Sequence, residues 1–200
     1  MPDSTDEAER SRADKIALRS RLLTNRRHLS PVTLGSAASH LQDQVLALVR
    51  GEHAAVVAAY VPVGAEPGGP GLIPALAASA RVLLPVLLPD GDLDWAAYEG
   101  VLTAGPRGLL EPPGARLGVS AISSAGLVLV PALAVDRRGV RMGRGGGSYD
   151  RALARIPSSG PLVVALLHDG ELLDEVPAEP HDRPVHAAIT PNGGLFRVAV

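Results

Sequence analysis

The stretch from Arg141 to Asp150 reads RMGRGGGSYD and constrains the fold more than any other part of the chain. Its four glycines lose backbone entropy on folding and offer no side chain to bury, so they must be there for backbone conformation. Glycines at positive φ let successive N–H groups face one side and form a concave anion site. A helix beginning at Ser148 would add the positive end of its dipole. Together with Arg141 and Arg144, the stretch predicts a phosphate-binding loop.

A tight turn between a strand and a helix would also explain a glycine cluster, and the glycine pattern alone is a weak signal. The flanking sequence favours the phosphate site. The apolar run from Gly126 to Pro131 has strand composition, and Tyr149 to Arg155 has helix composition until Pro157 ends it. A strand, a loop and then glycines at a helix start is the order in which open α/β sheets place ligand loops. No Gly-Lys-Ser/Thr follows, so this is not a Walker loop, and the spacing does not match the dinucleotide fingerprint.

The segment from Leu127 to Leu153, LVLVPALAVDRRGVRMGRGGGSYDRAL, resembles the signature of the 5-formyltetrahydrofolate cyclo-ligases, also called 5,10-methenyltetrahydrofolate synthetases. The family pattern is a strand, a proline, Phe-Asp, and then Arg-hydrophobic-Gly-x-Gly-x-Gly-Tyr-Tyr-Asp-Arg. The chain departs from it at Val135, where the family usually has Phe, and at Ser148, where it usually has the first of two tyrosines. Both departures remove an aromatic ring that we expect beside the site.

Alternation of five or six strands with helices predicts an α/β fold with a mainly parallel sheet between helix layers. The resemblance covers Lys15 to Asn192 with gaps, and it implies a three-layer Rossmann-like fold of the cyclo-ligase type. It also implies a ligase of folate one-carbon metabolism, which converts 5-formyltetrahydrofolate to 5,10-methenyltetrahydrofolate with ATP and magnesium and releases ADP and phosphate.

Composition and periodicity predict most of the helices and strands. We expect helices over Pro31 to Val49 and Leu72 to Ala80, and strands over Ala54 to Tyr60, Arg81 to Val86, Asp94 to Tyr98, Ile122 to Val130, Pro161 to Leu167 and His186 to Thr190. The strand at Asp94 should lie at an edge of the sheet.

Composition excludes several classes of protein. Two hundred residues, 46% of them hydrophobic, suit one folded domain. A net charge of −2, from 19 basic and 21 acidic residues, gives no electrostatic footprint for nucleic acid or an anionic membrane. The absence of cysteine rules out disulfides and thiolate chemistry. With no apolar run of secretory or membrane-spanning type, we expect a cytoplasmic monomer that binds neither nucleic acid nor membrane.

The N-terminal region divides into two parts. Residues 1–12 are polar and charged, so we expect a disordered tail followed by a single domain over 13–200. A helix should begin near Ala13 with Ile16, Leu18 and Leu22 on its apolar stripe. Its basic residues by themselves indicate a solvated face, but Lys15 and Arg19 are four residues apart and share one side of the helix. The resemblance implies that these two contact ATP phosphates.

The remaining ATP contacts implied by the resemblance lie in the glycine stretch. They are Arg141, Met142, Gly143, Arg144, Gly145, Gly146, Gly147, Ser148 and Tyr149. Arg144 has the catalytic role in this set, because it would neutralise charge on the phosphoryl group during transfer.

The folate site is expected near the end of the strand at 54–60. A lone loop glutamate such as Glu66 is usually solvated, but the family places a Tyr or Phe and then a Glu against the folate here. Tyr60 and Glu66 keep that spacing, and Val61 and Tyr149 complete the expected pocket. A fixed carboxylate can accept hydrogen bonds from the N–H donors of a pterin edge.

Two aspartates are the expected magnesium ligands. The resemblance assigns this role to Asp150, which ends the glycine motif, and to Asp182 in the segment Pro177-Ala178-Glu179-Pro180-His181-Asp182. Magnesium keeps several waters and phosphate oxygens, so two carboxylates suffice. Asp90, Asp92 and Asp94 alternate like a calcium loop but lack a flanking helix and a bidentate Glu. His168 and His186 match no family position, so we expect them to be structural.

A second class of function stays open from sequence. A non-catalytic folate- or nucleotide-binding paralogue is suggested by Val135, Ser148 and the Pro-Gly-rich segment 67–71, all expected beside the folate pocket. Catalysis is the stronger hypothesis, because a chain released from the chemistry would have little reason to keep Arg141, Arg144, Asp150 and Asp182 at the family spacing.

Overall fold

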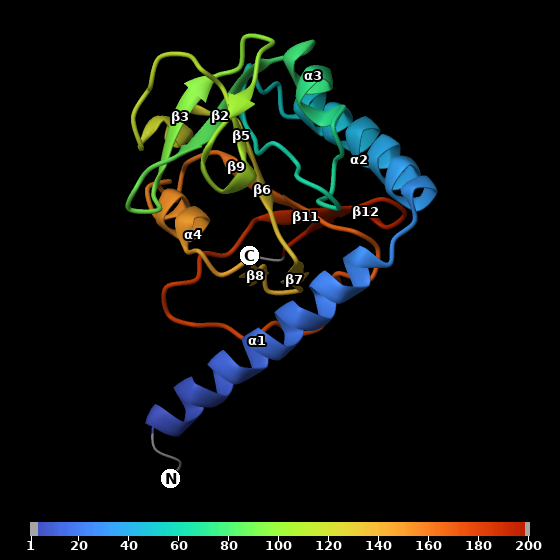
Figure 1. Cartoon of the computed structure of the whole chain (residues 1–200), viewed down its shortest axis with the longest axis vertical. Coiled ribbons are helices and arrows are strands. Elements are labelled where there is room, and N and C mark those ends of the chain that lie inside the picture. Colours follow the sequence, from blue (N-terminus) through green and yellow to red (C-terminus); the bar gives the residue numbers. More distant parts are fainter. Residues whose placement is uncertain (1–3, 199–200) are drawn as a thin grey trace.

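The structure is a computed structural model that describes residues 4–198 (Figure 1). Its helices are α1 (Ser4–Arg27), α2 (Pro31–Gly51), α3 (Leu72–Ala77) and α4 (Ser148–Leu153), with 3-10 turns η1 (Pro106–Gly108) and η2 (Ala121–Ser124). Its strands are β1 (Val56–Ala58), β2 (Arg81–Leu87), β3 (Leu93–Ala97), β4 (Thr103–Ala104), β5 (Leu110–Glu111), β6 (Leu127–Pro131), β7 (Ala134–Asp136), β8 (Arg141–Met142), β9 (Leu162–Leu166), β10 (Leu172–Leu173), β11 (Ala187–Thr190) and β12 (Gly194–Arg197). All six expected strands are present, although several begin later than expected.

Seven strands form the central sheet in the order β12-β11-β9-β6-β1-β2-β3. The five inner strands are parallel, and the antiparallel strands β3 and β12 lie at the two edges. The inner strands therefore have the spatial order 2-1-3-4-5, in which the direction of winding reverses between β1 and β6. In open α/β sheets the ligand crevice lies outside the carboxyl ends of the strands at such a reversal.

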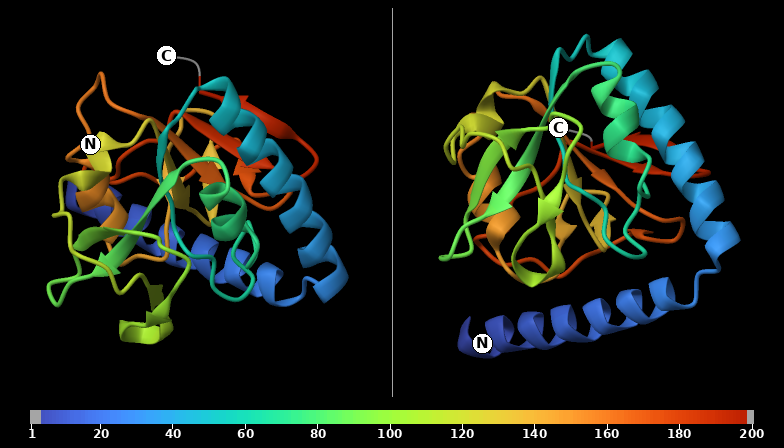
Figure 2. Two further views of the ribbon diagram at one scale, coloured as in Figure 1. Left: turned by 90° about the horizontal axis from the view of Figure 1, so that it is seen from above. Right: turned by 45° about the horizontal axis from the view of Figure 1, so that its top comes forward.

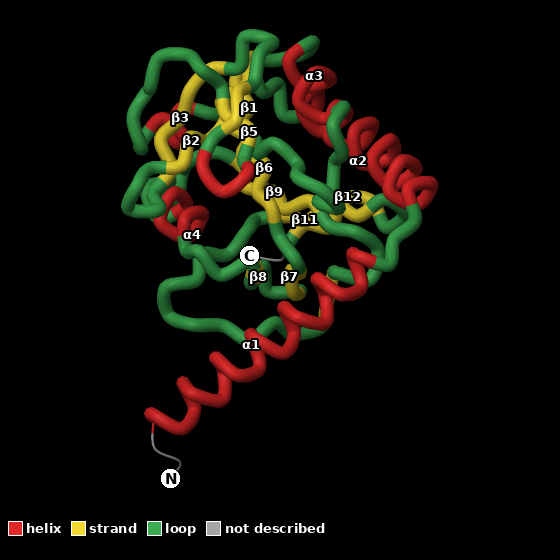
Figure 3. Tube along the Cα trace, in the orientation of Figure 1, coloured by secondary structure: helices red, strands yellow, loops and turns green. Residues whose placement is uncertain are grey.

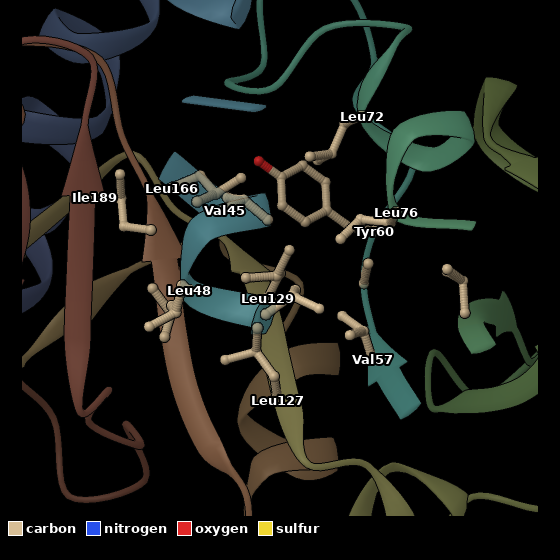
Figure 4. Packing of buried hydrophobic residues seen from close by; sticks show 14 of the residues in the cluster. Val45, Leu48, Val57, Tyr60, Leu72, Leu76, Leu127, Leu129, Leu166 and Ile189 are labelled. Carbon is tan, nitrogen blue, oxygen red and sulfur yellow. The ribbon is translucent and has the colours of Figure 1, made fainter. Parts of the chain in front are cut away.

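Apolar layers cover both faces of this sheet, which confirms the expected α/β fold with a mainly parallel sheet. Leu127 and Leu129 of β6 point to one face and pack with α2 and α3 (Figure 4). Val128 and Val130 point to the other face and pack with residues of α4 and η2. Figure 2 (left) shows α2 and α4 on opposite sides of the sheet. Side chains of successive strand residues alternate between faces, so one strand supplies both layers.

A smaller three-stranded sheet, in the order β10-β7-β8, connects the main sheet to α1. Leu22 of α1 is buried with Leu133, Met142 and Val176 from this region. Figure 3 shows β7 and β8 as short strands among loops, close to α1. This sheet was not predicted, because strands of two or three residues leave no periodic pattern.

The expected disordered tail over 1–12 is wrong for residues 4–12, which form the first turns of α1. The polarity of this segment indicates exposure, but its Ala, Glu and Arg residues favour helix. The helix is also held at two points, since the Ser11 hydroxyl donates to the Ala178 carbonyl at 3.1 Å and the Arg12 side chain pairs with Glu179 at 3.3 Å. Residues 1–3 lie outside the described part. None of the described helices has both the length and the apolar composition needed to cross a membrane.

Asp136, at the end of β7, joins the small sheet to the loop that follows β10. Its buried carboxylate accepts hydrogen bonds from the backbone amides of Arg138, Val140 and Val176, and from the Arg138 guanidinium at 2.8 and 3.0 Å. Burial by itself raises the pKa of Asp136, but the hydrogen bonds from Arg138 and the three amides outweigh it and lower the pKa below its usual value.

We therefore predict that Asp136→Asn lowers the free energy of unfolding by about 2–4 kcal/mol at pH 7, because an amide nitrogen would face donors. The folded-state pKa is lowered, so the stabilisation is fully present above the unfolded value of about 3.9 and is lost as the pH falls through the folded value. Urea denaturation of both proteins at several pH values measures this. The difference in free energy of unfolding between wild type and Asp136→Asn should decrease below about pH 4. A difference that does not change with pH would contradict the role of the ionised Asp136 carboxylate. Asp174→Asn, at an exposed surface pair with Arg137, is the control and should change stability by less than about 0.5 kcal/mol.

Candidate active site

A cavity of about 730 Å³ lies where the winding of the sheet reverses. Tyr60 and Val61 line it from the end of β1, and Pro131 and Ala132 from the end of β6. Segments distant in sequence complete it: α1, the glycine stretch, the loop at 179–182 and the β4–β5 hairpin. Every residue that we predicted for the ATP, folate and metal sites lines this one cavity.

The glycine stretch forms a loop between β8 and α4. Only Gly145 and Gly147 have positive φ, at 97° and 69°, so two of the four glycines adopt the expected left-handed backbone. A Cβ at Gly143 would lie 2.8 Å from Nη1 of Arg141, whose guanidinium is held by the Pro131 carbonyl and by Asp150, so glycine leaves room for that arrangement. The helix begins at Ser148 as expected, but α4 has only six residues and its dipole is correspondingly small.

Lys15 and Arg19 reach this loop from α1. The Lys15 ammonium is nearly buried and lies 2.5 Å from Asp182 and 2.8 Å from Glu179. The Arg19 side chain donates to the Gly143 carbonyl at 3.1 Å. Figure 1 shows why α1 contacts the 175–186 segment, which runs beside it along the bottom of the molecule. The basic stripe of α1 is therefore part of the site at these two residues. Ile16, expected in the apolar stripe, is instead 65% exposed and lines the cavity.

Arg141 is a buried organising residue of the site. Its guanidinium donates to the Pro131 carbonyl at 3.1 Å and to Asp150 at 2.9 Å. It also lies 5.9 Å from the centre of the Tyr149 ring, in cation–π range. Within the described residues, Arg141 Nε and the Tyr149 hydroxyl are buried without hydrogen-bond partners. Unpaired buried donors are costly, so a site that keeps two of them has donors to offer a bound molecule.

Glu66 and Arg144 form an ion pair across the cavity. The distance from Arg144 Nε to Glu66 Oε1 is 3.1 Å, and the second carboxylate oxygen of Glu66 accepts a hydrogen bond from the Val63 amide at 2.9 Å. The Glu66 side chain is largely buried, whereas that of Arg144 is 58% exposed and can exchange partners more easily. The residue expected at the folate and the residue expected at the phosphoryl group are thus direct neighbours.

The two tyrosines of the site are neutral at physiological pH. Burial raises the pKa of both Tyr60 and Tyr149, and the negative charge of Glu66 raises both further. The Tyr60 hydroxyl donates to the Pro67 carbonyl at 2.7 Å, which orients the ring. The Tyr149 hydroxyl is the one of the two left to act as a donor.

The cavity carries acidic side chains on the 179–182 loop and on α4. Glu179, His181 and Asp182 can bring ligand atoms within 4.8 Å of one another, whereas Asp150 pairs with Arg141 and is not in this group. In the described residues, one carboxylate oxygen of each expected ligand, Oδ2 of Asp150 and Oδ1 of Asp182, accepts no hydrogen bond. The pair Asp150 and Asp182 stays a prediction, and Glu179 is a neighbour of Lys15 that our sequence reasoning left without a role.

Two of the three sequence departures lie away from the cavity lining. Val135 is fully buried in a core cluster, and no residue of segment 67–71 is among those that line the cavity. Our expectation that all three adjoin the folate pocket is therefore wrong for Val135, whereas segment 67–71 contacts the cavity residue Tyr60 through the Pro67 carbonyl. Only Ser148 lines the cavity, and its hydroxyl donates to the Gly91 carbonyl at 2.6 Å. Ser148 therefore fastens α4 to the β2–β3 turn.

Other contacts around the site were not foreseen. Arg26 of α1 makes a buried bidentate pair with Glu171 at 2.7 Å and donates to the Ala132 carbonyl at 2.6 Å. His168 is hydrogen-bonded through its ring to the Ala65 carbonyl at 2.9 Å, and His186 Nδ1 accepts from the Val163 amide at 2.9 Å. Both histidines thus have structural contacts, as expected. The Arg26–Glu171 pair had no sequence signal, because its members are 145 residues apart.

Comparison with known proteins agrees with the geometry. A model of the 5-formyltetrahydrofolate cyclo-ligase family matches residues 11–191. The chain belongs to this family. A 5-formyltetrahydrofolate cyclo-ligase of Mycolicibacterium smegmatis is 43% identical over 189 residues, which cover 90% of this chain and 95% of that protein. A cyclo-ligase of Escherichia coli K12 is 34% identical over 119 residues, covering 58% of this chain and 65% of that protein.

Solved structures share the fold of this cyclo-ligase family member. The NMR structure of 5,10-methenyltetrahydrofolate synthetase from Aquifex aeolicus matches with a TM-score of 0.80 at 24% identity, over 93% of each chain. The synthetase from Mycoplasma pneumoniae matches with a TM-score of 0.69 at 19% identity, over 88% of this chain and 97% of that one. The predicted family and fold class are confirmed, and nothing in these matches supports a non-catalytic paralogue.

Because the Ser148 hydroxyl is bonded to Gly91, we predict that Ser148→Ala and Ser148→Tyr both lower the free energy of unfolding, Ser148→Ala by about 0.5–1.5 kcal/mol. Restoring the tyrosine of the family pattern would then cost this chain stability. Urea denaturation measures the effect. The control is Ser79→Ala, an exposed serine whose hydroxyl bonds to no described residue, and it should be near neutral. A Ser148→Tyr protein more stable than wild type would contradict the structural role.

Proposed function

We propose that the protein converts 5-formyltetrahydrofolate to 5,10-methenyltetrahydrofolate with ATP and magnesium, and releases ADP and phosphate. The observation that carries the proposal is the convergence of α1 cations, the glycine loop and an apolar wall on one cavity at the reversal point of the sheet. Membership of the cyclo-ligase family supports the reaction type. We expect the enzyme to act as a monomer in the cytoplasm, without nucleic acid or membrane.

The cationic side of the cavity suits a triphosphate. Lys15, Arg19 and Arg141 surround the loop Met142 to Tyr149, which includes Gly143, Arg144, Gly145, Gly146, Gly147 and Ser148. Lys15 and Arg141 are held by Asp182, Glu179 and Asp150, so their positions are fixed before a ligand arrives. Phosphate oxygens would compete with these carboxylates for the same donors, and cations already fixed lose little entropy on binding.

The other side of the cavity suits a folate. Tyr60, Val61 and Tyr149 offer flat and apolar surface, and Glu66 offers a fixed carboxylate for the N–H donors of a pterin. The neutral Tyr149 hydroxyl can donate to a substrate oxygen or nitrogen. Because Glu66 touches Arg144, the folate and the phosphoryl group to be transferred would meet at this pair.

The proposed chemistry joins the two substrates there. The formyl oxygen attacks the γ-phosphorus and ADP leaves; N10 of the folate then attacks the activated formyl carbon and gives up its proton to solvent, and phosphate leaves as the five-membered ring closes. The chain's own contribution is to hold the reacting atoms together and to neutralise charge, which is the main source of catalysis in phosphoryl transfer. Arg144 would carry out the second task, since its partly exposed guanidinium can exchange Glu66 for the phosphoryl oxygens.

The chemistry of two carboxylates at the cavity supports our assignment of a magnesium ion to them. Asp150 and Asp182 both line the cavity, and each keeps one carboxylate oxygen that accepts no hydrogen bond from the described residues. Carboxylate oxygens are the ligands that magnesium prefers. These two residues would hold the ion, which supplies charge neutralisation at the phosphates.

The direct test is an assay of the purified protein with ATP, magnesium and 5-formyltetrahydrofolate. We expect methenyl absorbance to rise in step with ADP, one for one, and to stop when EDTA removes the metal. Omitting ATP controls for acid-driven cyclisation. A folded protein that binds both substrates but forms no methenyl product with any divalent metal would contradict the proposed function.

For Arg144 we predict a loss confined to turnover. Arg144→Met should lower kcat about 10²–10³-fold, as expected for a group that stabilises developing charge, with little change in ATP affinity. Arg144→Lys should recover part of the rate. Steady-state kinetics and calorimetric ATP binding separate the two effects. Arg21→Gln, on an exposed part of α1 outside the cavity, is the charge control. An equal loss in ATP affinity and in turnover would make Arg144 a ground-state anchor.

A further inference from the structure

The β4–β5 hairpin lines the cavity next to β2, whose Pro85 and Leu87 also line it. It is a separate two-stranded sheet that projects from the body of the molecule (lime green in Figure 2, left). Its base is fixed, since the buried Glu111 accepts a hydrogen bond from the Leu87 amide of β2 at 2.8 Å. Its outer part brings Arg107, Leu109 and Leu110 to the cavity.

Arg107 differs from the other cations of the cavity. Six of the seven have a partner: Arg12 and Lys15 pair with Glu179, Arg26 with Glu171, Arg141 with Asp150 and Arg144 with Glu66, and Arg19 donates to the Gly143 carbonyl. Arg107 makes no hydrogen bond or ion pair with any residue that the structure describes. The other six cations lie on α1 and on the stretch from Arg141 to Arg144, whereas Arg107 lies in the hairpin turn just before Leu109 and Leu110.

The backbone conformation also distinguishes Arg107. Arg107 and Gly108 have φ of 57° and 74°, and the Leu109 amide bonds to the Pro106 carbonyl at 3.1 Å. This is the geometry of a primed hairpin turn, whose first central position favours Asn, Asp or Gly. An arginine there is contrary to local preference. Side chains kept at unfavourable backbone positions are often functional, and the inference runs from the outlier to the function.

The chemistry of the proposed substrate offers Arg107 a partner, and this inference rests on the proposed function. A folate has a flat pterin, an aromatic spacer and a glutamyl tail with at least two carboxylates. Glu66 and the tyrosines suit the pterin, and the exposed side chains of Leu109 and Leu110 offer apolar contact to the spacer. Beyond these leucines the first group on the hairpin that could meet the tail is a guanidinium without a partner, which binds carboxylates in bidentate geometry.

We propose that Arg107 is a specificity-determining residue that binds the glutamyl carboxylates of the folate, with Leu109 and Leu110 as the apolar wall before it. The side chain touches neither the phosphates nor the reacting atoms in this arrangement. It should therefore change the affinity for folates according to their tails and leave the chemical step unaltered.

The test variant is Arg107→Asn, because asparagine suits the primed turn and the hairpin should keep its shape. We expect KM for 5-formyltetrahydrofolate to rise about three- to tenfold, the effect of an exposed charge-assisted contact, with kcat and the KM for ATP unchanged. For an analogue whose glutamate is replaced by a simple amide, wild type and variant should have the same KM. Arg107→Lys should give an intermediate value, and Arg81→Gln, at the far end of β2 and outside the cavity, should have no effect.

Calorimetric binding of the same two folates without ATP gives a second readout that does not depend on turnover. A tail-dependent loss of affinity in the variant supports the inference even if no methenyl product forms, in which case the proposed function alone fails. An equal loss for both folates, no loss for either, or no folate binding by the wild type overturns the inference.

Discussion

The reversal of winding between β1 and β6 is the constraint on which the rest of the structure depends. The chain leaves β1 through α3 on one face of the sheet and leaves β6 through α4 on the other. Because these connections diverge, the carboxyl ends of the two strands are left uncovered and form a crevice. The loop carrying Glu66 follows β1, and the small sheet and glycine loop follow β6. The site is therefore a consequence of strand order as much as of its own residues.

Helix α1 completes the crevice through charge. The Lys15 ammonium is nearly buried, and a buried charge is tolerated only when it is paired. Asp182 and Glu179 are its partners. In the last turn of α1, the buried pair of Arg26 and Glu171 holds the helix in the same way. Pairing sets the geometry of the cations, and it makes ligand binding an exchange of partners between carboxylates and phosphates. A site built like this can be nearly neutral overall and still present ordered donors.

Sequence reasoning succeeded where the signal was local. The glycine stretch, the strand before it and the start of α4 at Ser148 follow from composition and backbone preference over a few residues. It failed where the outcome depended on distant partners. Val135 resembled a lost site residue, yet it is core. Ser148 stands where the family pattern has a tyrosine, yet its hydroxyl donates a hydrogen bond to Gly91, 57 residues away in the β2–β3 turn. The polarity of the start of α1 suggests a disordered tail, but its residues favour helix, and Ser11 and Arg12 are hydrogen-bonded to Ala178 and Glu179.

The sequence by itself determined the family, the mainly parallel sheet and the candidate ATP, folate and metal residues, all of which line the cavity, because motif spacing and strand composition are carried by neighbouring residues. Only the tertiary structure decided which of these residues touch. It paired Glu66 with Arg144, placed Asp182 with Lys15 and Glu179, and left Arg107 without a partner in the described chain. Contacts between loops that follow different strands depend on strand order and crossover direction, and neither is encoded in the local pattern of residues.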